Sequence, residues 1–156
     1  MRCVLQRVLE ARVDIDGETV GAIEQGLMIL VGVGEGDTES DARYLADKTA
    51  VLRIFSDDAD KMNLSILDVQ GSALVVSQFT LLADCRKGRR PAFTGAAEPQ
   101  IANRLYQSYC QRLVEQGIEV QTGRFAADMQ VHLINDGPVT ILLESPPKAK
   151  EDSNSG

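Results

Sequence analysis

The chain has 156 residues, of which 44% are hydrophobic, and a formal net charge of −7 at pH 7. These values suit one domain with a single buried core, and the acidic balance argues against nonspecific binding to DNA or RNA, because phosphate affinity rests on lysine and arginine. No run approaches the roughly 20 apolar residues that cross a bilayer, and the start lacks the apolar run of a signal peptide. We expect a soluble, cytoplasmic protein that contacts no membrane.

The cysteines are Cys3, Cys85 and Cys110, and their odd number and wide spacing suit a reducing compartment. No Cys-x-x-Cys pair occurs and His132 is the single histidine, so the ligands of a metal would have to come from scattered carboxylates. We therefore expect neither a metal ion nor a cofactor.

The first part of the chain predicts β-structure. Apolar and β-branched residues in 2–8 and 11–15 lead into Asp16-Gly17, a strong turn signal before a returning strand at 18–21. Residues 27–31 are a continuous apolar run between glycines, which is typical of a strand buried on both faces.

The middle of the chain predicts a helix and a central strand. Thr38 can cap a helix, and apolar residues then recur at helical spacing to about Ile54. A polar turn is expected at 57–60, and 73–79 reads as a buried strand that ends at polar residues.

A second helix is predicted from Glu98-Pro99 until Gly117, because proline favours the first turn of a helix and glycine its end. Its apolar face comprises Ile101, Leu105, Tyr106, Tyr109, Cys110 and Leu113. Three β-segments follow at 118–122, 129–134 and 139–143, with a turn at 135–138 between the last two.

These elements do not alternate strictly between strand and helix. They predict an α+β fold in which a curved mixed β-sheet or open β-barrel carries two main helices packed on one side. Residues 1–145 would form this single domain, and the tail 146–156, which has no apolar period, would be disordered.

A glycine-rich connection at 32–37 follows a strand and precedes a helix, as in dinucleotide-binding turns. Asp37 occupies the place of the third glycine of that motif, and acids at 35 and 37 would face a pyrophosphate. An ordinary strand-to-helix connection is the favoured interpretation, and a nucleotide-dependent enzyme stays as a rival.

Polar groups gather where the central strand ends, at Ser77, Gln78 and Thr80 on either side of Phe79. They can shape a pocket, although serine and threonine also end strands by bonding local backbone. Locally, 137–138 reads as an ordinary turn with a trans proline.

Four cations, Arg86, Lys87, Arg89 and Arg90, lie within five residues and are followed by Phe93. A solvated loop is the simpler interpretation. A local phosphate-binding loop is the alternative, which the negative net charge does not exclude.

Four segments closely resemble the D-aminoacyl-tRNA deacylase family, in the order in which that family has them. They are Met1-Arg2-x-Val4-Leu5-Gln6-Arg7-Val8, Ser77-Gln78-Phe79-Thr80-Leu81, Arg89-Arg90-Pro91-x-Phe93 and Asn135-Asp136-Gly137-Pro138-Val139-Thr140. Together they span nearly the whole chain except the tail. Ser-Gln-Phe-Thr and Gly-Pro-x-Thr in one short chain form a specific signature.

The resemblance implies a homodimeric proofreading hydrolase that cleaves the ester bond of D-aminoacyl-tRNA and of mischarged glycyl-tRNA. Gly137 and Pro138 match a cis Gly-Pro loop that enters the partner's pocket, where its main-chain carbonyls select the configuration of the substrate's α-carbon. Arg7, and with it Thr140, would support that loop. The other, catalytic wall would be the segment Ser77, Gln78, Phe79 and Thr80.

An aminoacyl ester is already activated, so positioning and main-chain donors could supply much of the rate acceleration without an ionisable base. We expect N–H groups around Gln78, Phe79 and Thr80 to engage the carbonyl while the neighbouring ribose hydroxyl assists a water. Thr80 as a covalent nucleophile is the competing version, which lacks an evident base.

An L side chain would meet the Gly137-Pro138 wall, whereas a D side chain would point to solvent. The 3′ acceptor end of tRNA would enter the pocket, with phosphates on Arg86, Lys87, Arg89 and Arg90. A non-catalytic dimeric RNA-binding module that uses the same basic loop is the other rival.

Overall fold

The computed structural model describes residues 1–148. Eight of the eleven residues in the predicted disordered tail, 149–156, lie outside the described part. Within residues 1–148, no helix has both the length and the apolar character that a membrane span requires.

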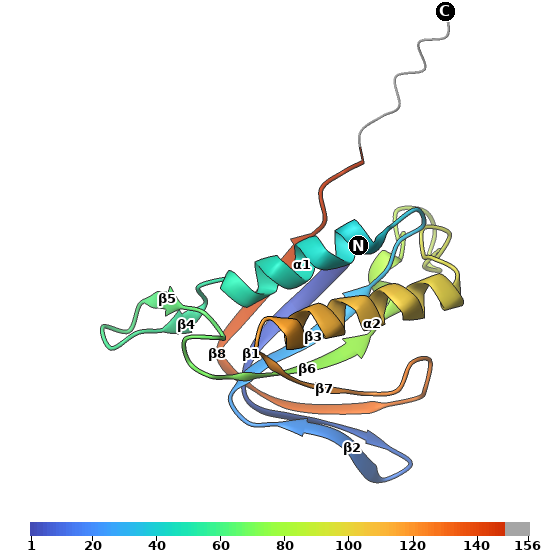
Figure 1. Cartoon of the computed structure of the whole chain (residues 1–156). Helices are drawn as coiled ribbons and strands as arrows, with labels where there is room; N and C mark the ends of the chain where they lie inside the picture. Colours follow the sequence, from blue (N-terminus) through green and yellow to red (C-terminus); the bar gives the residue numbers. More distant parts are fainter. Residues whose placement is uncertain (149–156) are drawn as a thin grey trace, which may run out of the picture.

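A six-stranded sheet forms the body of the molecule, and a separate two-stranded hairpin projects from it (Figure 1). The strands of the sheet are β1 (Arg2–Ile15), β2 (Glu18–Ile23), β3 (Gly26–Gly32), β6 (Ser72–Ser77), β7 (Glu119–Thr122) and β8 (Gln130–Glu144). The hairpin consists of β4 (Phe55–Ser56) and β5 (Met62–Leu64). Two α-helices, α1 (Glu39–Val51) and α2 (Pro99–Glu115), lie together on one side of the sheet.

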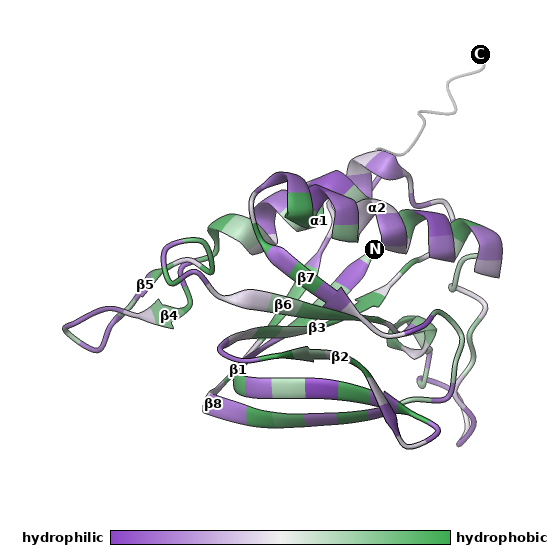
Figure 2. Ribbon diagram, turned by 60° about the horizontal axis from the view of Figure 1, so that its bottom comes forward, coloured by the Kyte–Doolittle hydropathy of each residue, from purple (hydrophilic) through white to green (hydrophobic). Residues whose placement is uncertain are grey.

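The sheet is mixed and strongly curved. The long strand β1 is antiparallel to all three of its neighbours: β3 pairs with residues 2–8, β2 pairs with residues 11–15, and β8 follows its other edge. On the far side, β3, β6 and β7 are parallel. A Cβ atom at Gly21 on β2 would lie 2.6 Å from the carbonyl oxygen of Thr122 on β7, so the sheet almost closes on itself (Figure 2).

The curved sheet has a core on each face. Leu5 and Ile29 of the sheet and Tyr109 of α2 belong to the core between the sheet and the helices. Residues such as Val13 and Leu74 form the core inside the curve. The predicted α+β fold, with a curved mixed sheet and two helices on one side, is confirmed.

The helix ends follow the sequence signals. The Thr38 N–H donates to the Asp41 carboxylate at 2.8 Å, which closes a capping box at the start of α1. Helix α2 begins at Pro99 and stops before Gly117, whose φ of +93° suits glycine. Ile101, at the edge of its apolar face, is 37% exposed.

Two predicted boundaries are wrong. The central strand ends at Ser77, because Phe79–Leu82 turn into a short 3₁₀ helix, η1. Residues 135–138 do not reverse the chain: β8 is one continuous strand, and both of its halves run antiparallel to β1. The polar Gly-Pro segment is accommodated by register shifts opposite Gln6, Val8 and Glu10 rather than by a hairpin.

Candidate functional site

The candidate site begins where β6 leaves the sheet. The Gln78 N–H donates to the carbonyl of Val31 on β3 at 2.8 Å, so it is not the free donor that the sequence analysis expected, and the chain then turns into η1. The N–H groups of Phe79 and Thr80 belong to the first turn of this helix, which leaves them without an internal acceptor. The rest of residues 1–148 supplies none, so both donors are available to a ligand.

A pocket of about 510 Å³ lies beside this strand end. One wall is formed by Ser77, Gln78 and Phe79, and another by the first turn of α2 with Pro99 and Ala102. The remaining lining residues come from the end of β3, from 96–97 and from the segment that joins β7 to β8: Val33, Val76, Ala96, Ala97, Phe125, Ala126, Ala127, Asp128, Met129 and Val131. Thr80 is not among the residues that line it.

The sequence patterns did not predict the wall formed by residues 125–129. Ala126 there has a φ of +63°, a left-handed conformation that alanine rarely adopts. The run Phe125-Ala126-Ala127 carries no glycine or asparagine that would announce such a turn. No local signal would have revealed this wall.

The Thr80 hydroxyl accepts a hydrogen bond from the Gln78 side-chain amide. That amide is the one hydrogen-bond partner that residues 1–148 offer it, and an amide is not a base at neutral pH. Two thiols are also poor nucleophiles, since burial raises the pKa of both Cys3 and Cys110 to about 12.

The basic loop is a hairpin closed by the bridge between Asp84 and Ala92. Its four cationic side chains are exposed, but Arg86 donates to the Asp84 carboxylate at 2.9 and 2.8 Å. This bond lowers the pKa of Asp84. Phe93, after the loop, packs edge-on against Phe79 with ring centroids 5.1 Å apart, so the loop adjoins the pocket.

The Gly137-Pro138 peptide bond is cis, as the family resemblance implied. The Arg7 side chain links this segment to Ile54, the residue before β4. Its Nε donates to the carbonyl of Asp136 at 3.0 Å, and its Nη1 donates to the carbonyl of Ile54 at 2.8 Å. Thr140 instead accepts a hydrogen bond from the Gln6 amide at 3.4 Å.

Within one chain, the structure does not bring the Gly-Pro segment to the pocket. Between β8 and β6 stand β1 and β3, so three inter-strand steps of about 4.8 Å separate them. Arg7 lies beside the Gly-Pro segment. In the sheet, Arg7 pairs with Leu27 and Leu27 pairs with Ala73, which lies four residues before Ser77. That offset adds roughly 13 Å along the strands.

The family model described as D-Tyr-tRNA(Tyr) deacylase matches residues 4–144. The chain belongs to this family. Curated relatives carry the name D-aminoacyl-tRNA deacylase: one from Thermotoga petrophila is 57% identical over 145 residues, which cover 93% of this chain and 97% of that one. One from Geobacter sulfurreducens is 58% identical over 93% of this chain and 95% of its own length.

Two solved structures share the fold of this deacylase-family chain. The c-Myc DNA unwinding element binding protein superposes with a TM-score of 0.88 at 39% identity, covering 94% of this chain and all of its own. A probable eukaryotic D-amino acid tRNA deacylase has a TM-score of 0.79 at 16% identity, covering 92% of this chain and 98% of its own.

The rival nucleotide-binding turn is not favoured in this deacylase-family fold. The Gly34 N–H, a donor that a phosphate would need, already donates to the Asp37 carboxylate at 2.6 Å. In residues 1–148, no three His, Cys, Asp or Glu side chains cluster closely enough to hold a metal ion.

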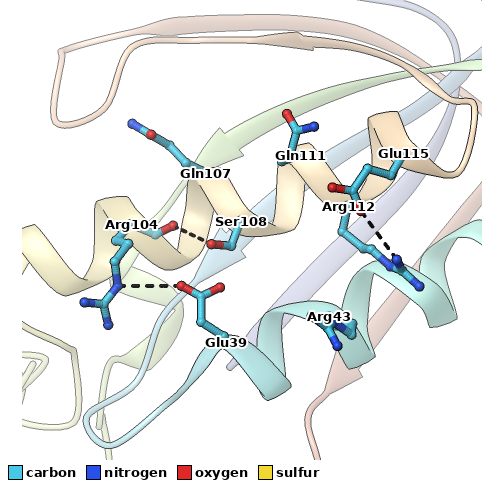
Figure 3. Close-up of a pocket in the computed structure, with 8 residues that line it drawn as sticks. All are labelled: Glu39, Arg43, Arg104, Gln107, Ser108, Gln111, Arg112 and Glu115. Atoms are coloured by element: carbon cyan, nitrogen blue, oxygen red, sulfur yellow. Dashed lines mark hydrogen bonds and ion pairs between the residues drawn. The ribbon is translucent and has the colours of Figure 1, made fainter.

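A second hollow of about 480 Å³ lies between α1 and α2 (Figure 3). Its walls are polar and their charges are largely paired: Arg104 lies 3.6 Å from Glu39, and Arg112 lies 2.7 Å from Asp47 and 3.4 Å from Glu115. None of the residues that the deacylase resemblance singled out lines it. We assign the pairs Arg104–Glu39 and Arg112–Asp47 to the packing of the two helices.

Proposed function

We propose that this chain is a D-aminoacyl-tRNA deacylase that hydrolyses the ester between a D-amino acid and tRNA, and thereby proofreads translation. The family match over residues 4–144 carries the assignment of the reaction. The pocket at the end of β6 is the proposed place of the reaction, because Phe79 lines it, Thr80 follows directly, and the N–H groups of both have no acceptor in residues 1–148.

In this proposal the ester carbonyl lies against the N–H groups of Phe79 and Thr80. These donors stabilise the negative charge that develops on the carbonyl oxygen as water attacks, and fixed donors need no reorganisation during the reaction. Water adds to the carbonyl carbon, the bond between this carbon and the ribose oxygen breaks, and a proton from the water passes to the ribose oxygen. The ribose hydroxyl beside the ester orients the water.

The site would be completed by a second copy of the chain. One subunit holds its Gly137-Pro138 segment far from its own pocket, so a pocket that uses both features needs a partner's loop. Strand β8 pairs only with β1 in the described sheet, and it leaves Ile134 49% and Leu142 61% exposed. Exposed apolar side chains on an edge strand are typical of a surface that pairs with another chain.

The site would select D-amino acids by steric exclusion of L side chains. With the amino group and the carbonyl of the substrate held by main-chain atoms, the partner's Gly-Pro wall leaves no room for an L side chain and tolerates a D side chain or glycine. Binding of the tRNA would add phosphate contacts from Lys87, Arg89 and Arg90, with a smaller share from Arg86 because Asp84 neutralises it.

Incubation of the purified chain with D-tyrosyl-tRNA and L-tyrosyl-tRNA tests the proposal. We expect release of D-tyrosine, and little L-tyrosine, without added cofactor and in the presence of EDTA. Binding of the D-ester without cleavage would instead support a non-catalytic RNA-binding module. Equal cleavage of both esters would contradict the proposed selection by the Gly-Pro wall.

A further inference from the structure

Tyr106 connects helix α2 to the strand that forms the first wall of the pocket. Its side chain is 5% exposed, and its hydroxyl donates to the carbonyl of Val75 at 2.8 Å. Val75 is the last residue of β6 that pairs with β7, through Thr122. Beyond this rung, β6 continues alone on that side to Ser77, so the bond fixes the strands at the point where they separate.

The same side chain also contacts the wall at 125–129. The ring of Tyr106 packs against that of Phe125, with centroids 6.3 Å apart, and Phe125 lines the pocket. Ala102, one helical turn before Tyr106, lines it as well. One buried residue therefore joins the strand leading to Ser77, the turn at 125–129 and the first turns of α2.

We propose that Tyr106 is a positioning residue that sets the spacing between the Gln78–Phe79 main chain and the wall at 125–129. It does not line the pocket and would act only through Val75 and Phe125. Its expected effect on catalysis rests on the proposed function, whereas its effect on the geometry of the two walls does not. Small displacements of groups that hold an ester can cost large factors in rate.

Tyr109 provides a matched control on the same helix. It is fully buried, and its hydroxyl is 2.8 Å from the Thr49 hydroxyl, which itself donates to the carbonyl of Leu45 at 2.7 Å. Since Thr49 has one proton to donate, Tyr109 is the donor in this bond. Tyr109→Phe therefore removes the same kind of buried bond as Tyr106→Phe, but toward α1 and away from the pocket.

The experiment compares both variants with the wild-type chain by D-tyrosyl-tRNA cleavage and by amide hydrogen exchange in the segments 77–80 and 125–129, read at the hydrogen-bonded N–H groups of Gln78 and Ala127. We expect Tyr106→Phe to speed exchange at both walls and to lower kcat at least about tenfold, with KM changed less than about twofold. Tyr109→Phe should lower the Tm similarly without either effect. Unaltered exchange at the walls in Tyr106→Phe, or equal effects of both variants, would overturn the proposal.

Phe125→Leu alters the contact between Tyr106 and Phe125 from the side of Phe125. It is the second test if Tyr106→Phe does not fold. It keeps the hydroxyl bond to Val75 but removes the contact between the rings. We expect faster exchange at residues 77–80 as well as at the mutated wall, and exchange confined to 125–129 would contradict the proposal. If the wild-type chain cleaves no ester, the proposed function fails, while the exchange data still decide whether Tyr106 sets the spacing.

Discussion

Arg7 on β1 donates a hydrogen bond from Nε to the main-chain carbonyl of Asp136 on β8, 3.0 Å away, just before the Gly-Pro segment. The second bond, from Nη1 to the carbonyl of Ile54, is buried. The planar guanidinium can reach both carbonyls at once because its donors point in different directions. A lysine in its place carries all of its donors on one nitrogen, which cannot lie at both the Nε and the Nη1 position.

Arg7→Lys should therefore destabilise the protein by about 1.5–3 kcal/mol, the usual value of a hydrogen bond to a charged group. Arg12→Lys is the control, because Arg12 lies on the same strand, is 47% exposed and pairs with Asp14. Its effect should stay below about 0.5 kcal/mol. Urea denaturation measures both, and equal midpoints would show that Arg7 does not hold β8.

Phe79→Pro tests the main-chain donor directly, because proline has no N–H and is tolerated at the first position of a helix. Phe79→Ala also removes the ring that packs on Phe93 but keeps the N–H. We expect the proline variant to have a kcat about 10²- to 10³-fold below that of the alanine variant. Similar values of kcat in single-turnover assays would exclude the Phe79 N–H as an oxyanion donor.

Thr80→Val separates the two mechanisms for the attack on the ester. Because the Gln78 amide cannot take a proton from the Thr80 hydroxyl, we expect the variant to keep a kcat within about tenfold of the wild type. Attack by the hydroxyl would instead predict loss of nearly all activity and an acyl-enzyme in the wild type. Mass spectrometry of the quenched reaction detects that intermediate.

Hybrid dimers test whether two chains build each site. Gly137→Val would place a branched side chain where even a Cβ lies 3.0 Å from Val139 and 3.1 Å from Arg7. Mixed with Phe79→Pro chains, it should restore about a quarter of wild-type activity. Half of the randomly mixed dimers are hybrids, and each hybrid has one intact site. If subunit exchange is confirmed and activity is not restored, the Phe79 N–H and the Gly-Pro segment of two different chains do not form one site.

Arg89→Gln combined with Arg90→Gln should raise the KM for D-tyrosyl-tRNA and flatten its dependence on salt. For a single strand, the slope of log affinity against log salt falls by about 0.7 for each phosphate that the protein no longer neutralises. Arg86→Gln should have a smaller effect, because Asp84 already pairs with Arg86 at 2.8 Å. An unchanged slope in the double variant would remove the loop from the RNA interface.

Elements with strong end signals were predictable from the sequence. Thr38 and Asp41 close a capping box, and Pro99 and Gly117 bound α2, so propensity and tertiary structure agree there. The Gly137-Pro138 segment misled the prediction, since these residues favour turns locally. Pairing with β1 on both sides overrides that preference and keeps β8 continuous.

The candidate site was predictable only in part. The strand end at 77–80 carried polar residues in a recognisable pattern, but the wall at 125–129 is made of residues such as Phe125 and Ala127 that carry no functional signature. Tyr106 looked like one more apolar residue of the α2 face. Its bond to Val75 joins parts of the chain far apart in sequence, and local patterns do not encode such contacts.

Strand β1 pairs with β2, β3 and β8, and this restricts insertions and deletions in β1 during evolution. Inserting or deleting one residue between Arg2 and Val8 would turn the inward side chains of β1 outward, because successive residues of a strand face opposite sides. Cys3 and Leu5 would leave the core, and Arg7 would no longer reach Asp136. Changes in length are tolerated far more readily at the exposed polar turn 57–60.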